Sequence, residues 1–397
     1  MALDPARSGA EPPRPAANGE ARRGDGRARK KAARILAQAD IEIGGDRPWD
    51  IQVHDERLWH RALTQGSLGL GEAYMEGWWD CERLDMFFHR LLSSDLRKAV
   101  HLSAPELATA LKSRLFNRQS RRKADEVARR HYDIDRALFE SMLDERMVYS
   151  CAYWKDVEDL DAAQEAKLRL SCEKLGLKPG MRVLDIGCGW GSLATFAAER
   201  FDVEVVGVTI SHEQAVAARE RCAGLPVEIR ETDYREMPEE TFDRVVSIGM
   251  FEHVGPKNHR TFFKVAHRHL APGGLLLLHT IAQSKRVRAP DPWIERHIFP
   301  NGHLPTLGQI ARAAEGRFVV EDVHNIGAHY DRTLMAWNER FQLGWPDLSM
   351  SKDGTFKRMW EYYLLSSAGG FRARTLQCYQ VVLARDRGIE GGIVPVR

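Results

Sequence analysis

The stretch "VLDIGCGWG" contains residue types that could bind a ligand through the backbone. An apolar run reaches Asp185, and Gly187, Gly189 and Gly191 follow it. Because glycine has no side chain, a ligand can approach the backbone closely, and cofactors of open sheets bind at the carboxyl ends of the strands. The stretch therefore predicts a cofactor site formed by a strand end and the turn that opens the next helix.

The spacing of these glycines separates two cofactor classes. Dinucleotide enzymes prefer G-x-G-x-x-G with an acidic residue about 20 positions later. Here the third glycine comes one position early, and the second strand ends in Val208 and Thr209. An Asp before G-x-G-x-G is instead typical of class I methyltransferases, which use S-adenosylmethionine. The segment from Thr209 to Gln214 lies where ribose and methionine groups are reached in such enzymes. Asp233 and Tyr234 follow the third strand, where adenine is held, and Asp233 could accept from the adenine amino group.

A carboxylate and an imidazole follow the next two apolar runs. "FEHVG" supplies Glu252 and His253, and "LLLLHTI" supplies His279. At one sheet edge such a pair could remove a proton or capture an anion. Methylases that act on exocyclic amines of nucleic-acid bases carry Asn or Asp followed by Pro-Pro-aromatic at the position of "MFEHVG". The absence of that motif disfavours base methylation.

Parallel strands are needed to bring these side chains to one edge. After Pro179, strand patterns in "MRVLDIG", "VEVVGVTIS", "FDRVVSIGM" and "GGLLLLHTI" alternate with helical patterns. This alternation implies right-handed crossovers and a parallel sheet. We therefore expect an α/β fold, a Rossmann-like doubly wound sheet of the class I methyltransferase type, over residues 131–390.

The overall composition narrows the possible partners. The 397 residues contain 58 Lys plus Arg and 56 Asp plus Glu, so the net charge of +2 indicates no nucleic-acid partner. No apolar run approaches the ~18 residues of a membrane span. The six cysteines form no C-x-x-C pair and follow no signal-peptide core. We therefore expect reduced thiols, a cytoplasmic location and no metal site.

The first third of the chain differs from the rest in composition and in its predicted secondary structure. Residues 1–30 are rich in Pro, Gly, Ala and Arg, and we expect a disordered basic tail. Residues 31–110 predict a smaller α-rich N-terminal domain for lipid binding or dimerisation. Its Trp78, Trp79, Phe87 and Phe88 form either a small core or an apolar surface for a lipid or another subunit. Residues 111–130 predict a basic linker whose arginines could face phosphates, although charged helix faces are usually just solvated.

Longer stretches carry a family resemblance. They include "GSLGLGEAYMEGWW", "YSCAYW", "LKPGMRVLDIGCGWG", "GMFEHVGPKN", "TLMAWNERF" and "AGGFRAR", and they span roughly residues 35–385 in order. The sequence resembles the bacterial cyclopropane-fatty-acyl-phospholipid synthases, which are related to the mycolic acid cyclopropane synthases. The resemblance implies methyl transfer from S-adenosylmethionine to a cis double bond of a phospholipid acyl chain, followed by proton loss and ring closure. It also implies a homodimer bound peripherally to the bilayer at the inner face of the membrane.

The resemblance further implies the residues of the site. In that family the base is bicarbonate, and its contacts here would be Cys151 and Ile281, largely through backbone N–H groups. Glu252, His279 and Tyr330 would complete the cage. "YSCAYW" would supply part of an aromatic wall around the carbocation. The expected cofactor-binding residues are Tyr149, Ser150, Asp185, Gly187, Gly189, Gly191, Thr209, Gln214, Asp233 and Tyr234.

Two alternative functions stay open on the sequence alone. A related fatty-acyl C-methyltransferase could stop at methyl addition and give a methyl-branched or methylene product, because the same carbocation can partition differently. Alternatively, a non-catalytic lipid-binding relative could keep S-adenosylmethionine as a structural ligand. The intact set of Glu252, His279 and Tyr330 favours an active enzyme.

Overall fold

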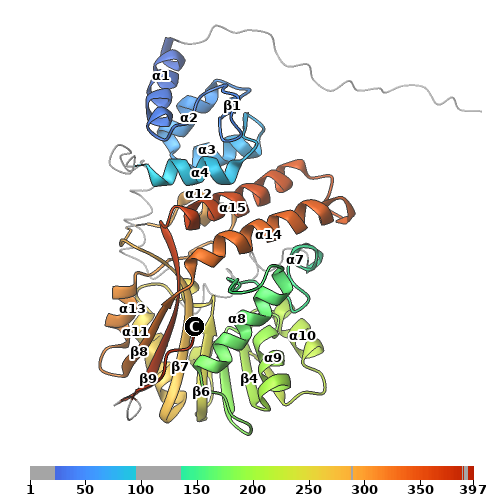
Figure 1. The fold of residues 1–397 in the computed structure, drawn as a ribbon, viewed down its shortest axis with the longest axis vertical. Coiled ribbons are helices and arrows are strands. Elements are labelled where there is room, and N and C mark those ends of the chain that lie inside the picture. Colours follow the sequence, from blue (N-terminus) through green and yellow to red (C-terminus); the bar gives the residue numbers. More distant parts are fainter. Residues whose placement is uncertain (1–22, 95–135, 288, 387, 389–391) are drawn as a thin grey trace, which may run out of the picture.

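The computed structural model describes residues 23–94, 136–287, 289–386, 388 and 392–397 (Figure 1). The expected basic linker at 111–130 lies outside these residues, as does the segment 1–22. Helix α1 (Arg23–Gln38) begins inside the expected disordered tail, so residues 23–30 are helical. Its run of Ala, Arg and Lys explains this difference, because these residues favour helix strongly. No helix in the described part of the chain is long and apolar enough to cross a membrane.

The larger part of the chain is built on a seven-stranded sheet with the order β5-β4-β3-β6-β7-β9-β8. Its parallel strands are β3 (Arg182–Ile186), β4 (Glu204–Thr209), β5 (Val227–Glu231), β6 (Phe242–Ile248) and β7 (Leu270–Gln283). Strand β9 (Leu376–Arg385) pairs antiparallel with β7 and with β8 (Phe318–Asn325). The expected doubly wound sheet is confirmed, and the antiparallel pair at one edge is an addition.

Helices cover both faces of this sheet (Figure 1). One face packs against α8 (Leu160–Lys174), α9 (Ser192–Phe201) and α10 (His212–Arg221), and the other against α11 (His259–His269) and α13 (Leu307–Ala314). Neighbouring strand residues point to opposite faces. Val183 accordingly belongs to the first apolar cluster and Leu184 to the second. The buried strands are therefore apolar on both sides, as in other parallel sheets.

A helical layer lies between the sheet and the N-terminal unit (Figure 1). It contains α12 (Pro292–His297), α14 (Gly327–Gly344) and α15 (Gly354–Arg372), with α7 (Arg136–Met142) beside α14. The N-terminal unit contains α1, β1 (Gln52–Val53), α2 (Arg57–Gln65), α3 (Ser67–Met75), β2 (Trp79–Asp80) and α4 (Leu84–Ser93). Short 3-10 turns complete the description: η2 (Tyr234–Glu236), η3 (Phe251–His253) and η4 (Trp345–Asp347).

The N-terminal unit is joined tightly to the helical layer through α4 and α15. A Cβ on Gly369 would lie 2.6 Å from Phe88 Cβ, so only glycine allows this close crossing. Arg372 donates two hydrogen bonds of 2.8 Å to Asp331 of α14 and one of 2.6 Å to the buried Asp85 of α4. Trp79 and Phe88 both pack their rings against Tyr362 of α15. These contacts hold the N-terminal unit against the helical layer and, through it, the sheet.

Candidate active site

A cavity of about 890 Å³ is lined by residues from both the sheet edge and the N-terminal unit. This size lies within the range of small-molecule and cofactor sites. From the sheet edge come Asp185, Gly187, Gly189, Thr209, Gln214, Asp233 and Tyr234. From the N-terminal unit come Leu36, Ile51, Trp59, Leu70, Phe87, Phe88 and Leu91. The same cavity therefore has a polar end at the glycine turn and an apolar extension.

The three glycines of the turn have different roles. All adopt positive φ angles, +85° at Gly187, +55° at Gly189 and +80° at Gly191. Gly189 has open space where a Cβ would point, and both Gly187 and Gly189 line the cavity. Gly191 does not line it, and a Cβ there would lie 3.1 Å from Ala218 Cβ of α10. Gly191 therefore permits the packing of α9 on α10. A Cβ on Gly187 would lie 2.7 Å from the side chain of Met250, so Gly189 is the glycine of the turn that leaves open space for a ligand.

The ends of β4 and β5 carry the next two predicted groups. Thr209 Oγ1 donates to Gln214 Oε1 over 3.0 Å, which fixes the amide at the start of α10. Asp233 accepts from Arg235 Nε over 2.8 Å and from the Arg235 backbone N–H over 2.9 Å. Because Arg235 holds the carboxylate in one orientation, Asp233 is presented to the cavity together with Tyr234. The structure thus places Thr209, Gln214, Asp233 and Tyr234 in the same cavity as the glycine turn.

Two buried charges lie at the polar end of the cavity. Burial raises the pKa of Asp185 to about 7, although the charge of Lys167 opposes the shift. Lys167 of α8 is 1% exposed, and burial lowers the pKa of its ammonium to about 8. Its Nζ donates to Ser150 Oγ over 2.9 Å. Ser150 was an expected site residue, whereas Lys167 was not. Lys167 lies in a run of alternating charges, and such a run is typical of a solvated helix.

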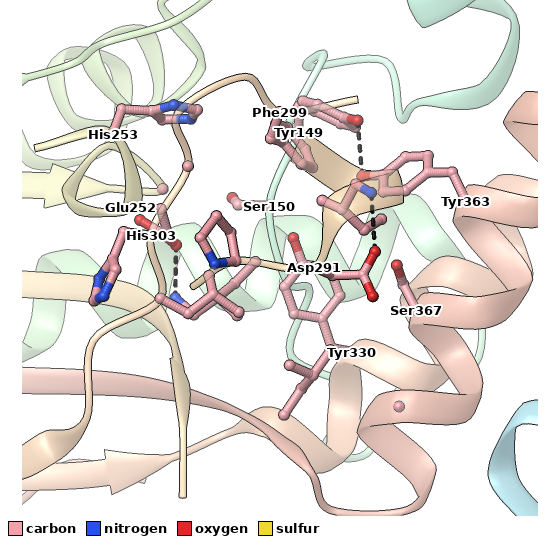
Figure 2. Close-up of a pocket in the computed structure, with 18 of the residues that line it drawn as sticks. Tyr149, Ser150, Glu252, His253, Asp291, Phe299, His303, Tyr330, Tyr363 and Ser367 are labelled. Atoms are coloured by element: carbon pink, nitrogen blue, oxygen red, sulfur yellow. Dashed lines mark hydrogen bonds between the residues drawn. The ribbon is translucent and has the colours of Figure 1, made fainter. Parts of the chain in front are cut away.

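Glu252 is a buried residue of η3 that contacts β7. Its Oε1 accepts from the Ile281 backbone N–H over 2.6 Å, and its Oε2 is buried without a hydrogen-bond partner in the described chain. Burial is the main cause that raises the pKa of Glu252 to about 7. The Ile281 N–H, which we expected to face an anion, thus donates to Glu252 in this structure. Figure 2 shows Glu252, Ser150 and Tyr330 around the same space.

His279 and Tyr330 line the cavity as uncharged groups. Burial and the nearby lysines hold the pKa of His279 well below its usual value, so the imidazole is neutral. Gln380 Nε2 lies 3.4 Å from His279 Nδ1, and Cys378 Sγ lies 3.2 Å from His279 Nε2. Burial raises the pKa of Tyr330 well above its usual value, so the phenol keeps its proton. Its ring stacks on Phe371 at a centroid distance of 4.5 Å.

The expectation for "YSCAYW" needs a correction. Tyr149 and Ser150 line the cavity, but Cys151, Tyr153 and Trp154 do not. Trp154 Nε1 donates to Thr333 Oγ1 over 2.9 Å, and Tyr153 packs on His329, so both rings belong to the core instead of a carbocation wall. Cys151 is fully buried, and its thiol donates to the Ala152 carbonyl.

Other aromatic rings take the place of those two in the cavity wall. The Tyr149 hydroxyl lies 2.9 Å from the Tyr363 hydroxyl (Figure 2). The aromatic lining also includes Trp190, Phe299, Tyr330, Tyr362 and Phe371. Most of these rings come from the helical layer, whose arrangement over the sheet is not encoded in a local motif.

The site was then compared with known proteins. Residues 119–381 match the family model "Mycolic acid cyclopropane synthetase". The chain belongs to this family. Among its relatives, the cyclopropane-fatty-acyl-phospholipid synthase of Escherichia coli strain K12 is 53% identical over 362 residues, covering 91% of this chain and 94% of that protein. A probable fatty acid methyltransferase of Pseudomonas putida is 33% identical over 348 residues, covering 83% of this chain and 84% of that protein.

A solved structure of the family agrees with this assignment. The mycolic acid cyclopropane synthase CmaA1, complexed with SAH and CTAB, superimposes with a TM-score of 0.62 at 33% identity. The match covers 66% of this chain and 98% of that chain. The family membership confirms the predicted fold class and the predicted enzyme class. The chain is an S-adenosylmethionine-dependent C-methyltransferase.

Proposed function

We propose that this enzyme methylates the cis double bond of unsaturated acyl chains in membrane phospholipids and closes a cyclopropane ring, with bicarbonate as the general base. The observation that carries the proposal is the single cavity that joins the glycine turn to an apolar extension in the N-terminal unit. An acyl chain needs such an extension, because its apolar surface must leave water along most of its length.

The polar end of the cavity fits S-adenosylmethionine. Gly189 leaves room for a ligand to approach the backbone, and Asp233 can accept from the adenine amino group. Thr209 and Gln214 line the same end of the cavity and would contact the ribose or the methionine group. When bound, the cofactor supplies the electrophilic methyl group. The role of the chain is then to orient this group toward the alkene.

Bicarbonate fits the groups around Glu252. A buried carboxylate oxygen without a partner is costly, and the Oε2 atom of Glu252 is such an oxygen. It can accept from the hydroxyl of a bound bicarbonate, while the protonated Tyr330 can donate to another oxygen. When bound, bicarbonate supplies a weak base for the proton that leaves the transferred methyl. Glu252, His279 and Tyr330 line this part of the cavity and would hold it, whereas Cys151 does not line the cavity and is assigned no contact.

The aromatic lining serves the carbocation that methyl addition creates. A desolvated cation gains about 0.5–2 kcal/mol from each aromatic face that it contacts. The rings of Tyr149, Phe299, Tyr330, Tyr363 and Phe371 all line the cavity. They also exclude water, which would otherwise capture the cation. An apolar aromatic site therefore favours proton loss and ring closure over hydration.

Peripheral membrane binding completes the proposal. Helix α1 exposes Arg27, Arg29, Lys30, Lys31 and Arg34, and Lys31 also lines the cavity. Positive charges near an anionic membrane surface contribute about 1 kcal/mol each and are screened by salt. We propose that the N-terminal unit contacts the inner, cytoplasmic face of the membrane and that the enzyme acts there as a homodimer.

Product analysis tests the main proposal. The purified enzyme is incubated with methyl-labelled S-adenosylmethionine and vesicles of phosphatidylethanolamine and phosphatidylglycerol that carry monounsaturated chains. We expect the released fatty acids to gain the mass of one CH₂ and to lose the alkene. A product that gains this mass but keeps a double bond, or that carries a saturated methyl branch, would contradict ring formation. No gain in mass would point to the lipid-binding alternative.

Vesicle sedimentation tests the membrane contact. The same enzyme is mixed with neutral and with anionic vesicles at increasing salt. We expect tighter binding to the anionic vesicles and a loss of binding as salt rises. Equal sedimentation with both kinds of vesicle at every salt concentration would contradict the electrostatic part of the proposal. Light scattering of the free enzyme gives its molar mass in solution and tests the homodimer.

A further inference from the structure

His279 is contacted at both ring nitrogens by side chains of the neighbouring strand β9. In the antiparallel pair of β7 and β9, His279 lies directly opposite Gln380, and Cys378 lies two residues along on the same face of the sheet. All three side chains are buried, with at most 1% exposed. Gln380 Nε2 lies 3.4 Å from His279 Nδ1, and Cys378 Sγ lies 3.2 Å from His279 Nε2. The position of the ring hydrogen therefore depends on which of these groups donates.

Helix α8 decides which way the amide of Gln380 faces. Ser171 Oγ donates its single hydrogen to the Lys167 carbonyl over 2.8 Å, so it can only accept from other groups. Gln380 Nε2 donates to Ser171 Oγ over 3.3 Å. With the amide turned over, its oxygen would face the Ser171 oxygen, and neither atom would have a hydrogen to share. The NH₂ group of Gln380 therefore faces Ser171, and its second hydrogen faces His279 Nδ1.

The chain keeps this amide in the core at a cost. The Oε1 atom of Gln380 is buried, and no residue of the described chain forms a hydrogen bond with it. A buried polar atom without a partner destabilises a fold. Because an apolar side chain would avoid this cost, the amide points to a function at His279.

A donor at Nδ1 places the ring hydrogen of His279 on Nε2. The pKa of His279 lies well below its usual value, because burial and the charges of Lys167 and Lys174 disfavour the imidazolium. A neutral imidazole carries one N–H hydrogen. Since Nδ1 accepts from Gln380, this hydrogen is on Nε2 and points toward Cys378 Sγ.

The Nε2 end of the ring faces the groups that would hold bicarbonate. Cys378 lies close enough to Cys151, Glu252 and Tyr330 for electrostatic interaction with each of them. His279, Glu252 and Tyr330 line the cavity, whereas Cys378 does not. Sulfur is a weak hydrogen-bond acceptor, and an oxyanion is a strong one. An anion in this part of the cavity would therefore take the N–H of His279 from Cys378.

We propose that Gln380, oriented by Ser171, is a positioning residue that keeps the hydrogen of the neutral His279 ring on Nε2, so that the ring donates a hydrogen bond to bound bicarbonate. The inference rests on the bicarbonate site proposed above. It makes His279 a donor to the anion and excludes it as the base, since its other nitrogen already accepts from Gln380. Glu252 would accept from the hydroxyl of the same bicarbonate while His279 donates to one of its oxygens.

Magnetic resonance of the full chain with ¹⁵N-labelled histidine reports which ring nitrogen carries the hydrogen. His279→Gln identifies the signal, and potassium bicarbonate is titrated against potassium chloride of the same ionic strength. Gln380→Met removes the donor at similar side-chain size. Gln377→Met is the matched control, because Gln377 is a buried glutamine of the same strand that faces the other side of the sheet and does not line the cavity. Melting curves report on the fold of each variant.

We expect the wild-type ring to be neutral with its hydrogen on Nε2, and its signal to shift saturably with bicarbonate and not with chloride. In Gln380→Met the ring should populate both neutral tautomers, and the apparent affinity for bicarbonate should fall roughly tenfold, since the donor is no longer held in place. Ser171→Ala should act in the same direction, and Gln377→Met should match the wild type. Calorimetric affinity for S-adenosylhomocysteine should stay within about threefold in every variant, because neither Gln380 nor Ser171 lines the cavity.

A hydrogen on Nδ1 or a charged ring in the wild type would overturn the inference, and this result needs no variant to fold. Unchanged spectra and affinity in Gln380→Met would also overturn it, as would a change of tautomer without a loss of affinity, or a loss of affinity without a change of tautomer. If the wild-type signal does not respond to bicarbonate, the bicarbonate site of the proposed function is wrong, whereas the tautomers of the wild type and of Gln380→Met still decide whether Gln380 positions the ring hydrogen.

Discussion

Replacement of Glu252 by Gln is the sharpest test of the base in this enzyme. The substitution keeps an oxygen that can accept from the Ile281 N–H, which now donates over 2.6 Å to Oε1. It replaces Oε2, the buried oxygen without a partner, by an NH₂ group. An acceptor that could hold the hydroxyl of a bound anion thus becomes a donor, while the backbone contact and the side-chain shape are preserved.

The size of the effect follows from the lost contact. A hydrogen bond to a charged group contributes about 1.5–3 kcal/mol. Each 1.36 kcal/mol is tenfold in rate, so turnover should fall by about 10- to 150-fold. In the described part of the chain, Glu252 forms no hydrogen bond with the glycine turn, and the affinity for S-adenosylhomocysteine should therefore stay within about threefold of the wild type.

Two measurements check this prediction. Transfer of labelled methyl into vesicle lipid is followed at saturating cofactor, in bicarbonate-free buffer and after bicarbonate is restored, and calorimetry gives the affinity for S-adenosylhomocysteine. Glu315→Gln, which changes an exposed carboxylate, controls for the substitution. Wild-type turnover by Glu252→Gln in bicarbonate-free buffer would refute the assigned role. A parallel loss of turnover and cofactor affinity would place Glu252 in the cofactor site instead.

Three further outcomes are expected. Gly189→Val should weaken binding of S-adenosylhomocysteine roughly tenfold or more, because residue 189 has a φ of +55° and the new Cβ would enter the cavity. If calorimetry shows an unchanged affinity, the glycine turn is not the cofactor site. Affinity for the same ligand should rise with pH through about 7 as Asp185 ionises and fall above about 8 as Lys167 loses its proton. A flat calorimetric profile from pH 6 to 9 would contradict a role of these two groups in binding the ligand. Arg372→Met should lower the free energy of unfolding by about 1–3 kcal/mol, since the hydrogen bonds to Asp331 and to a buried carboxylate of α4 are lost; unchanged denaturant unfolding would show that this contact does not hold the N-terminal unit.

Much of the catalytic fold is determined locally and can be read from the sequence. The alternation of apolar runs with helical patterns predicts β3, β4, β6 and β7, because a strand buried on both faces must be apolar throughout. Parallel strands end at one edge, so Asp185, Thr209 and Glu252 had to come together once the sheet formed. The order of the motifs was sufficient for the family resemblance and the cofactor class.

The residues that complete the cavity wall depend on contacts between distant segments. Tyr153 and Trp154 are close to Tyr149 in sequence, yet they pack against α14 in the core. Tyr330 and Phe371 of the helical layer line the cavity instead. No local pattern encodes how that layer lies over the sheet. The apolar extension likewise combines residues of α1, α2, α3 and α4 with a sheet edge that is distant in sequence.

The burial of Lys167 also could not be predicted from the sequence. Ala163 and Gln164 lie one turn before it, and all three are buried, so Lys167 belongs to the inner stripe of α8. The sequence determined that it lies on a helix and at which spacing. Only the packing of that helix against Ser150 and the end of β3 decided that the ammonium is buried, because the exposure of a helical position depends on what covers it.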